Sequence, residues 1–443
     1  MATTYYIDLD LATSGGAGTT TTDPYNATEG IAAIMALAGD EGGDTYLFKR
    51  GSSHIVTTSI QILTAASASN FNLGAYGTGA LPIFDGQNNE ASKYLFELQA
   101  IQNVIIRDLY ITNAKAIGIL IKPTTGTVSN VEVYGCSFID IGVARAADTH
   151  DAINIQGRTA AYATGCKFKH NYINNTGNNG LEISFCDGFH SSDNIYIDCF
   201  NNAIELWDQC DNGVHEKETM NGCRRMAWTA NEGGLQHTNN TFKNNLVYNI
   251  GVHAYKDENS TGTVIDNCTF HIAAGSVDTS TRMVSIVGAD AAASITIRNN
   301  IFMLGVPAAS VGFMIFFQSA NISTATIDSN VYFYHTAAGV ASDLKFNDNT
   351  ANRTKLTEWT ASANTPAGTD ANSVEDSDPL FTDILNGDAV LLASSPALYE
   401  TLTEVAGTVV DDLNRDARYG GIDAGALQYQ RHTSVTVGSS IDK

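Results

Sequence analysis

The chain is sparing with charge and with cysteine. Only 16% of its 443 residues are charged, and its seven cysteines are an odd number with no Cys-X-X-Cys pair. This cysteine usage argues against a disulfide framework and against a zinc site. We expect most cysteines to be buried thiols, although Cys210 and Cys223 lie in a predicted loop where they can pair. No stretch approaches the roughly 20 apolar residues of a membrane span.

Basic side chains are scarce as well. The chain has 24 Lys and Arg against 47 Asp and Glu, a formal net charge of −23. Such a surface repels nucleic acid and anionic membranes, so we expect neither as a partner. An acidic surface is equally typical of proteins from saline water. If the ligand is itself an acidic polysaccharide, a local basic cluster or a bridging Ca²⁺ must overcome the repulsion.

What the chain does contain is a short phrase that recurs between residues 103 and 333. An apolar residue is followed by two others, then by Asn or a substitute, one further residue and a second apolar residue. The copies begin at Ile106, Val133, Phe168, Ile195, Phe242, Ile265, Ile297 and Ile327. Their spacings run from 23 to 47 residues, as expected for solenoid turns with loops of variable length.

Each copy is too short for a helix and is rich in β-branched and aromatic residues, which predicts a strand. Stacked parallel strands would together bury the apolar faces that no single copy can bury. One inward position would then form a ladder of hydrogen-bonded amides. Its members are Asn171, Asn245, Asn300 and Asn330, with Cys136 and Cys268 as buried substitutes. A β-sandwich of hairpins is the alternative, but two-residue Asn-Gly turn signals are sparse.

With these repeats, and with segments near both ends, the chain resembles right-handed parallel β-helix proteins of the pectate-lyase-like superfamily, of the phage tailspike and polysaccharide depolymerase type. The end segments are 5–8, 43–51, 74–86, 378–381, 395–397, 412–415 and 423–429. The resemblance implies an all-β fold, a single-stranded right-handed parallel β-helix. The fold specifies almost nothing about the reaction, because lyases, hydrolases, epimerases and adhesins share it.

A single solenoid accounts for the whole chain in three parts. Residues 1–95 would form the N-terminal cap and first turns, including a short capping helix at 31–38. Residues 96–345 would form the central β-helix with a glycan-binding face. Residues 346–443 would supply the last turns and a C-terminal capping segment that covers the open strand edges.

A polar stripe is predicted along one face of the central part. Strands alternate their side chains, so the residues after an inward apolar residue should point outward. The stripe consists of Asn154, Glu182, Glu205, Gln236 and Lys256. Neighbouring turns lie about 4.8 Å apart, which would put the carboxylates of Glu182 and Glu205 at roughly 5 Å. That separation fits a retaining glycosidase pair or a Ca²⁺ site, and it raises one pKa, as a general acid requires.

Asp151 and Asp208 are the further carboxylates expected beside this pair. The 47-residue interval after Ile195 exceeds one turn, so residues 208–232 are interpreted as an insertion that overhangs the stripe. Arginine can clamp an acidic sugar and tryptophan can stack on a sugar ring. The binding candidates are Arg224, Arg225, Trp207 and Trp228. His150 and His190 flank the stripe and are candidates for an acid or base. The alternatives without function are a solvated strand face for the stripe, a salt-bridged loop for the two arginines, local packing for the tryptophans and a satisfied polar role for the histidines.

Three functions remain open from the sequence. The first is a depolymerase that cleaves a bacterial or algal polysaccharide, with hydrolysis favoured over β-elimination because carboxylates outnumber bases in the stripe. No cofactor is expected to be required, and Ca²⁺ is an option only if the protein is a lyase. The second is a glycan-binding adhesin or virion fibre, and the third is an inert architectural solenoid. Residues 1–25 have neither the basic start nor the apolar core of a secretory signal, so the chain as it stands does not have the pattern of a secretory precursor. We expect an extracellular or virion location, reached either after removal of a signal or by lysis of the cell, as for phage proteins. The tailspike resemblance implies a homotrimer and phage tail proteins as partners.

Overall fold

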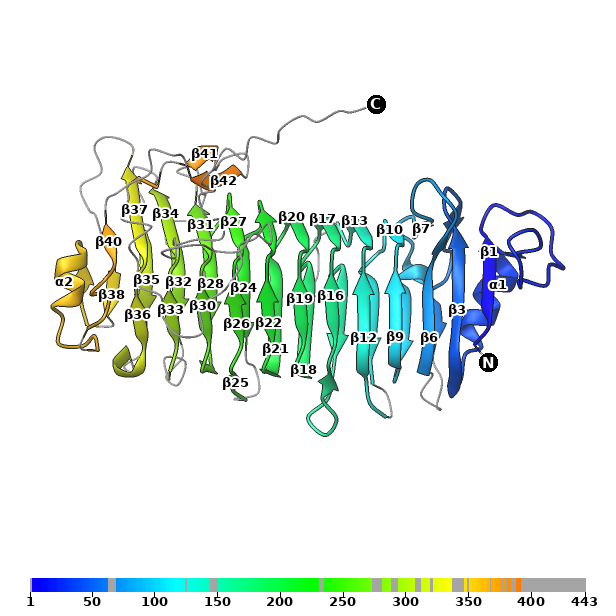
Figure 1. Cartoon of the computed structure of the whole chain (residues 1–443), viewed down its shortest axis with the longest axis horizontal. Helices are drawn as coiled ribbons and strands as arrows, with labels where there is room; N and C mark the ends of the chain where they lie inside the picture. Colours follow the sequence, from blue (N-terminus) through cyan, green and yellow to red (C-terminus); the bar gives the residue numbers. More distant parts are fainter. Residues whose placement is uncertain are drawn as a thin grey trace, which may run out of the picture.

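The computed structural model is an elongated parallel β-solenoid with α1 (Ala27–Met35) near one end and α2 (Leu356–Thr360) near the other (Figure 1). It describes residues 2–62, 69–123, 126–143, 150–230, 235–272, 281–287, 294–306, 312–318, 322–336, 346–348, 350–366, 368–375, 378–379, 381–383 and 388–391. The predicted all-β solenoid is confirmed. Among these residues, no helix is both long and apolar enough to cross a bilayer.

A central turn contributes one strand to each of three parallel faces. The β18 face contains β5 (Ile60–Ile62), β8 (Tyr94–Gln99), β11 (Ile117–Lys122), β14 (Ile153–Gln156), β18 (Leu181–Asp187), β21 (Asn202–Asp211), β24 (Arg225–Ala230), β28 (His253–Asp257), β32 (Arg282–Ile286), β35 (Phe313–Phe317) and β38 (Phe346–Asp348).

The β19 face contains β1 (Thr4–Asp8), β3 (Asp40–Lys49), β6 (Ser69–Tyr76), β9 (Gln102–Arg107), β12 (Ser129–Tyr134), β16 (Lys167–Lys169), β19 (His190–Ser192), β22 (Val214–Glu216), β26 (Thr241–Lys243), β30 (Val264–Asp266), β33 (Thr296–Arg298) and β36 (Thr326–Asp328). Its strands follow those of the β18 face along the chain.

The β20 face contains β4 (Ser53–Ile55), β7 (Ile83–Asp85), β10 (Tyr110–Thr112), β13 (Ser137–Ile141), β17 (Tyr172–Thr176), β20 (Ile195–Cys199), β23 (Thr219–Asn221), β27 (Leu246–Tyr248), β31 (Thr269–Ile272), β34 (Ile301–Val306), β37 (Val331–Thr336) and β40 (Val374–Glu375). The remaining elements are β2 (Tyr25–Asn26), β15 (Ala163–Thr164), β25 (His237–Thr238), β29 (Ser260–Thr261), β39 (Asn352–Arg353), β41 (Phe381–Asp383), β42 (Asp388–Leu391), η1 (Glu90–Ser92) and η2 (Ile322–Thr324).

The interior of the solenoid is apolar and continuous. One buried cluster runs from Ile7 to Trp359. Aromatic rings stack from turn to turn within it, with centroids 5.2 Å apart for Phe270 and Phe302 and 5.4 Å apart for Phe302 and Tyr332. Turn-on-turn stacking of this kind is what allows short strands with only one apolar face to form a stable core.

The asparagine ladder is present at the corner between the β19 and β20 faces. The backbone N–H of Cys136 donates to Oδ1 of Asn171 at 3.0 Å, and that of Cys268 donates to Oδ1 of Asn300 at 2.9 Å. Asn300 in turn donates its backbone N–H to Oδ1 of Asn330 at 3.1 Å. Each side chain thereby satisfies a buried backbone group of the turn before it, which is why Asn recurs at this position.

The register differs from the prediction in the middle of the chain. Asn194, not Asp198, is the ladder residue of its turn, because its Oδ1 accepts the backbone N–H of Asn171. The next ladder residue is Glu218, which accepts the N–H of Asn194 and donates its own N–H to Asn245. Residues 208–232 are therefore not an overhanging insertion. They include a complete further turn, formed by β22, β23 and β24.

The predicted short helix is present at the N-terminal end of the solenoid, and a second helix, α2, which was not predicted, lies near the other end. Asn26 caps α1, and it forms a reciprocal capping box with Glu29, so the helix begins four residues earlier than expected. At the other end Trp359 of α2 is buried, with its ring 5.2 Å from that of Phe346. The predicted terminal segments at 395–397, 412–415 and 423–429 lie outside the described residues.

All seven cysteines are free and buried. Cys210 lies opposite Cys186 of the preceding turn of the β18 face, whereas Cys223 lies beside Cys199 of the preceding turn of the β20 face. The proposed Cys210–Cys223 pair is therefore wrong, because the two residues stack with different neighbours.

Candidate functional site

The polar stripe lies on the β18 face, where the strand register brings its members into line. Asn154 pairs with Glu182, and Glu182 pairs with Glu205. The next positions along the solenoid are Trp228 and Lys256. Four of the five predicted stripe residues therefore align. Gln236 does not, because it precedes β25, and Trp228 occupies its expected place.

A second column runs beside the stripe, three residues earlier in each turn. Its members are Asp151, Asn179, Asn202, Arg225, His253 and Arg282. The two columns are in contact within a turn, since the Asn154 amide donates to Asp151 at 2.8 Å and the Asn179 amide donates to Glu182 at 3.2 Å. The site is thus two residues wide and extends over successive turns.

Three carboxyl groups gather at one end of these columns. Asp151 and Glu205 are buried, while Glu182 between them keeps partial exposure. The Asn179 amide donates to both Glu182 and Glu205, and the Asn154 amide bridges Asp151 and Glu182. A shared donor nitrogen holds the carboxyl oxygens of Glu182 and Glu205 within about 6 Å of each other.

Burial of these groups favours their neutral forms. Desolvation, reinforced by the charge of Glu182, raises the pKa of Glu205 to about 8, although the Asn179 hydrogen bond and Arg225 act against the shift. Desolvation also raises the pKa of Asp151 to about 7. Desolvation and the neighbouring Asp151 raise the pKa of Glu182 well above its usual value. The contact between Asp151 and Glu182 acts in opposite directions on the two groups, because it raises the pKa of Glu182 and lowers that of Asp151.

One acceptor atom of the cluster has no internal partner. Oε1 of Glu205 is buried and accepts or donates no hydrogen bond among the residues that the structure describes. Buried polar atoms normally have a partner, because an unsatisfied one costs about 1–3 kcal/mol. A buried oxygen without a partner is tolerated more easily on a neutral carboxyl group than on a carboxylate, in agreement with the raised pKa of Glu205.

The character of the columns changes beyond the carboxyl groups. Nη1 of Arg225 donates to Oδ1 of Asn202 at 3.1 Å and to Oδ1 of Asn201 at 2.9 Å. Lys256 forms an ion pair with Glu258, and the guanidinium of Arg282 lies 3.6 Å from the centre of the Phe316 ring. Along the solenoid axis the site therefore passes from acidic to basic side chains.

The remaining predicted residues fall in different places. Trp207 lies two residues beyond Glu205 on β21 and so faces the same side. Asp208 stands at a bulge with φ 57° and is not among the largest influences on the pKa of Glu182 or Glu205. Arg224 is exposed at the turn before β24. The structure describes only the backbone of Trp228, which is in register with Glu205.

The two histidines expected beside the stripe lie on different parts of the solenoid. His150 is buried immediately before Asp151, and its carbonyl accepts the N–H of Asn178 at 2.9 Å. His190 lies on the β19 face, where Nε2 is 2.8 Å from Glu216, so the expectation that it flanks the stripe is wrong.

Asn179 and Asn202 are the site residues that sequence reasoning missed. The Asn202 amide donates to Oδ1 of Asn179 at 2.9 Å, so the two form a buried amide ladder behind the carboxyl groups. A signal was available, because Asn-X-X-Glu occurs in two successive turns at 179–182 and 202–205. The described residues bring no three His, Cys, Asp or Glu side chains into an arrangement that could hold a metal ion, and the expectation of Ca²⁺ in a lyase stays a prediction.

Comparison with known proteins identifies the fold. No family model and no curated protein matches the chain. Among solved structures, a GH136 lacto-N-biosidase from Eubacterium ramulus superposes with a TM-score of 0.55 and 13% identity over 78% of this chain, which spans 66% of that enzyme. XylC in complex with xylose gives 0.52 and 10% identity, over 96% of this chain and 99% of XylC.

Pectate lyase Pel9A is similar over almost the whole length. It gives a TM-score of 0.50 and 14% identity, with 96% of each chain covered. The chain has the pectate-lyase-like β-helix fold. At these identities the likeness is one of fold, and the chemistry has to be argued from the side chains.

Proposed function

We propose that the protein is a polysaccharide-cleaving enzyme, a glycoside hydrolase that uses the carboxyl groups of Glu182, Glu205 and Asp151. The observation that carries the proposal is the buried Glu205 with a raised pKa and a free Oε1, directly opposite Glu182 on the adjacent turn. A carboxylic acid kept neutral near pH 7, beside a second carboxyl group, is the arrangement that glycoside hydrolysis requires.

The separation of the pair favours a double displacement with retention at the anomeric carbon. Retaining enzymes hold their carboxyl groups about 5–5.5 Å apart, whereas inverting enzymes leave room for a water molecule. Glu182 and Glu205 are adjacent in register and share the Asn179 donor, which supports the short separation. Glu205 would protonate the leaving oxygen while Glu182 attacks the anomeric carbon.

Asp151 gives Glu182 a way to be ionised when it attacks. The contact between the two groups raises the pKa of Glu182 and lowers that of Asp151, so the proton rests on Glu182 and has to pass to Asp151 before Glu182 attacks. Water would then cleave the glycosyl-enzyme intermediate, with Glu205 now acting as the base and recovering its proton. Trp207, on the same side of β21, is the aromatic candidate for contact with a sugar ring.

The comparisons add support without deciding the substrate. The similar structures include a lacto-N-biosidase, a pectate lyase and a protein solved with xylose, so the fold accommodates glycan chemistry of several kinds. We further propose that the protein acts outside the cell, secreted or as a trimeric virion component. Sedimentation equilibrium tests the trimer, and a monomer would contradict it.

Product analysis after incubation with a panel of acidic and neutral polysaccharides tests the proposed reaction. Mass spectrometry should show saturated oligomers, which the Glu182→Gln/Glu205→Gln double variant should not release. Absorbance at 235 nm would reveal unsaturated products and move the chemistry to a lyase centred on Arg225 and Lys256. A polymer that is bound but stays intact would contradict both reactions and identify a glycan-binding protein.

A further inference from the structure

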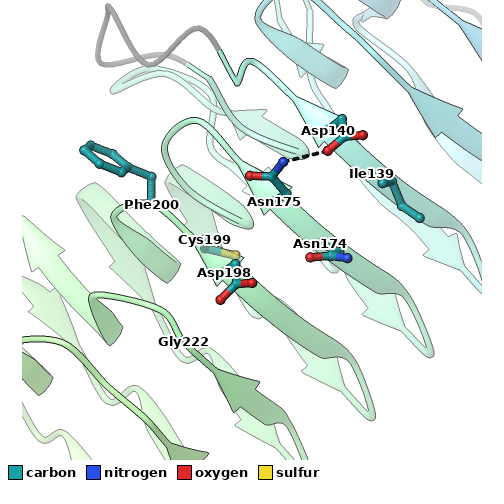
Figure 2. Close-up of a pocket in the computed structure, with 8 residues that line it drawn as sticks. All are labelled: Ile139, Asp140, Asn174, Asn175, Asp198, Cys199, Phe200 and Gly222. Carbon is teal, nitrogen blue, oxygen red and sulfur yellow. Dashed lines mark hydrogen bonds between the residues drawn. The ribbon is translucent and has the colours of Figure 1, made fainter. Parts of the chain in front are cut away.

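A hollow of about 690 Å³ opens at the ends of β13, β17 and β20, one corner away from the carboxyl groups. Its lining includes Asp140, Asn175, Asp198, Phe200 and Gly222. Figure 2 shows the hydrogen bond between Asn175 and Asp140 and the ring of Phe200 standing apart from them. A volume of this size lies in the range of small-molecule sites.

The hollow arises where a regular surface ladder is interrupted. Asp140, Asn175, Asp198 and Gly222 occupy the same position in four successive turns, and all have positive φ, between 51° and 71°. The Asn175 amide donates to Asp140 at 2.6 Å. The corresponding donor to Asp198 would come from residue 222, which is glycine.

The absence of a side chain at Gly222 leaves the Asp198 carboxylate without a donor from the next turn. A Cβ atom at this residue would lie 2.2 Å from Oδ1 of Asp198, so the carboxylate occupies the space that a side chain would fill. The exposed Asp198 carboxylate accepts no hydrogen bond from the part of the chain that the structure describes. It is available to accept hydrogen bonds from the hydroxyl groups of a ligand.

Phe200 supplies an apolar surface at the rim of the hollow. Its side chain is 49% exposed, the second most exposed large apolar residue described. An aromatic face can pack against the C–H face of a sugar ring. The hydroxyl groups at the edge of the same sugar then need hydrogen-bond partners. A hollow that has an exposed aromatic ring at its rim and a free carboxylate and an amide in its lining suits a sugar better than it suits a protein side chain.

The hollow is connected to the carboxyl cluster by two short stretches of chain. Asn201 and Asn202 follow Phe200 directly, and both bind Arg225 in the second column. Three residues separate Asn175 from Asn179, the shared donor of Glu182 and Glu205. A glycan placed on the β18 face can therefore continue around this corner.

We propose that the hollow at Asp198, Phe200 and Gly222 is a subsite for an uncharged sugar residue of the polysaccharide. The lining carries two carboxylates and no basic side chain, so it would repel a uronate or a sulfated sugar. This inference rests on the proposed function, and it names the class of sugar bound at one position.

The test separates binding from cleavage by using the Glu205→Gln variant as background. Retention in affinity gels is measured with arabinogalactan and xylan as neutral probes, and with polygalacturonate and alginate as acidic probes. Two changes alter the hollow: Phe200→Ala removes the ring, and Gly222→Asn restores the missing donor at a φ that Asn tolerates. Tyr134→Ala is the matched control, because Tyr134 is an aromatic residue 40% exposed elsewhere.

Retention should be strongest in one of the neutral gels. Phe200→Ala and Gly222→Asn should each weaken it by about tenfold, and Tyr134→Ala should leave it unchanged. When Phe200→Ala and Gly222→Asn are made in the protein that retains Glu205, each should raise KM more than it lowers kcat. Cleavage with unchanged KM in both variants would overturn the subsite and leave the proposed function standing. Retention that depends on Phe200 in a protein that cleaves no polysaccharide would support the subsite and overturn the proposed function. Retention in the acidic gels alone would overturn the subsite.

Discussion

Glu182 lies directly opposite Glu205 on the next turn of the solenoid, and a single amide group, that of Asn179, donates to both. The backbone register fixes the spacing of the two residues, and the amide fixes their side chains. Burial then keeps the Glu205 carboxyl neutral over the pH range in which a general acid has to work. The arrangement depends on three residues in two turns, so single substitutions can test the role of each residue.

Glu205→Gln should lower the cleavage rate by about 10²- to 10⁴-fold, because the amide cannot donate a proton to the leaving oxygen. Glycan binding should persist, since the side chain keeps its shape. Reducing-end release and retention in a polysaccharide gel measure the two properties. Asp208→Asn is the control: it removes a nearby carboxylate at the bulge and should leave cleavage unchanged. Equal losses in both variants would contradict the assignment.

Asn179→Ala should shift the pH profile of cleavage towards higher pH. The Asn179 hydrogen bond lowers the pKa of Glu205, which burial raises to about 8, so its removal should raise that pKa further. Since activity falls when the acid loses its proton, the alkaline limb should move upward, with a lower maximum rate. Asn201→Ala is the matched control, because Asn201 binds Arg225 and does not touch the carboxyl groups. A limb that stays in place would show that Asn179 does not tune the acid.

Glu218→Gln should make the stability of the protein less sensitive to a rise in pH between the ordinary carboxyl pKa of 4.5 and about 8. Glu218 is buried in the ladder, and desolvation raises the pKa of its carboxyl to about 8. A pKa that is raised on folding gives stability below the ordinary value of 4.5, and this stability is lost as pH rises towards 8. The wild type should lose roughly 1.4 kcal/mol per pH unit in that window from this group. Urea unfolding at pH 5 and pH 8 measures the difference, and an equal pH slope in the variant would refute it.

The sequence was sufficient to predict the fold because the Asn ladder repeats where the core residues are apolar. It failed where two successive turns place polar residues inside. Ser191 and His215 occupy the position that Phe168 and Phe242 hold in the neighbouring turns, so the repeat motif lacks its first apolar residue in these two turns. His215 is accommodated between aromatic rings, 4.8 Å from those of both Phe189 and Phe242, and burial lowers its pKa to about 3.

The site was partly predictable for the same reason. Period-two alternation aligned Glu182 with Glu205, since both strands begin with the same Asn-X-X-Glu spacing. The displaced register hid the turn that contains Trp228, and with it the true neighbour of Glu205. The bond from Asn179 to both carboxyl groups, and the interruption at Gly222, depend on side-chain positions at corners, which alternation along strands does not specify.

Asn300→Leu should lower the free energy of unfolding by about 2–4 kcal/mol. Asn300 accepts the N–H of Cys268 and donates its amide to the carbonyl of Ile265 at 3.0 Å, so the substitution leaves two buried backbone groups unsatisfied. Asn130→Gly is the control. Asn130 belongs to an exposed amide ladder, where its amide donates to Asn103, and Gly165 occupies its place in the next turn with the same positive φ. That change should cost less than about 1 kcal/mol, because water replaces the lost bond. Equal costs in chemical denaturation would mean that the interior ladder is no more important to stability than the surface one.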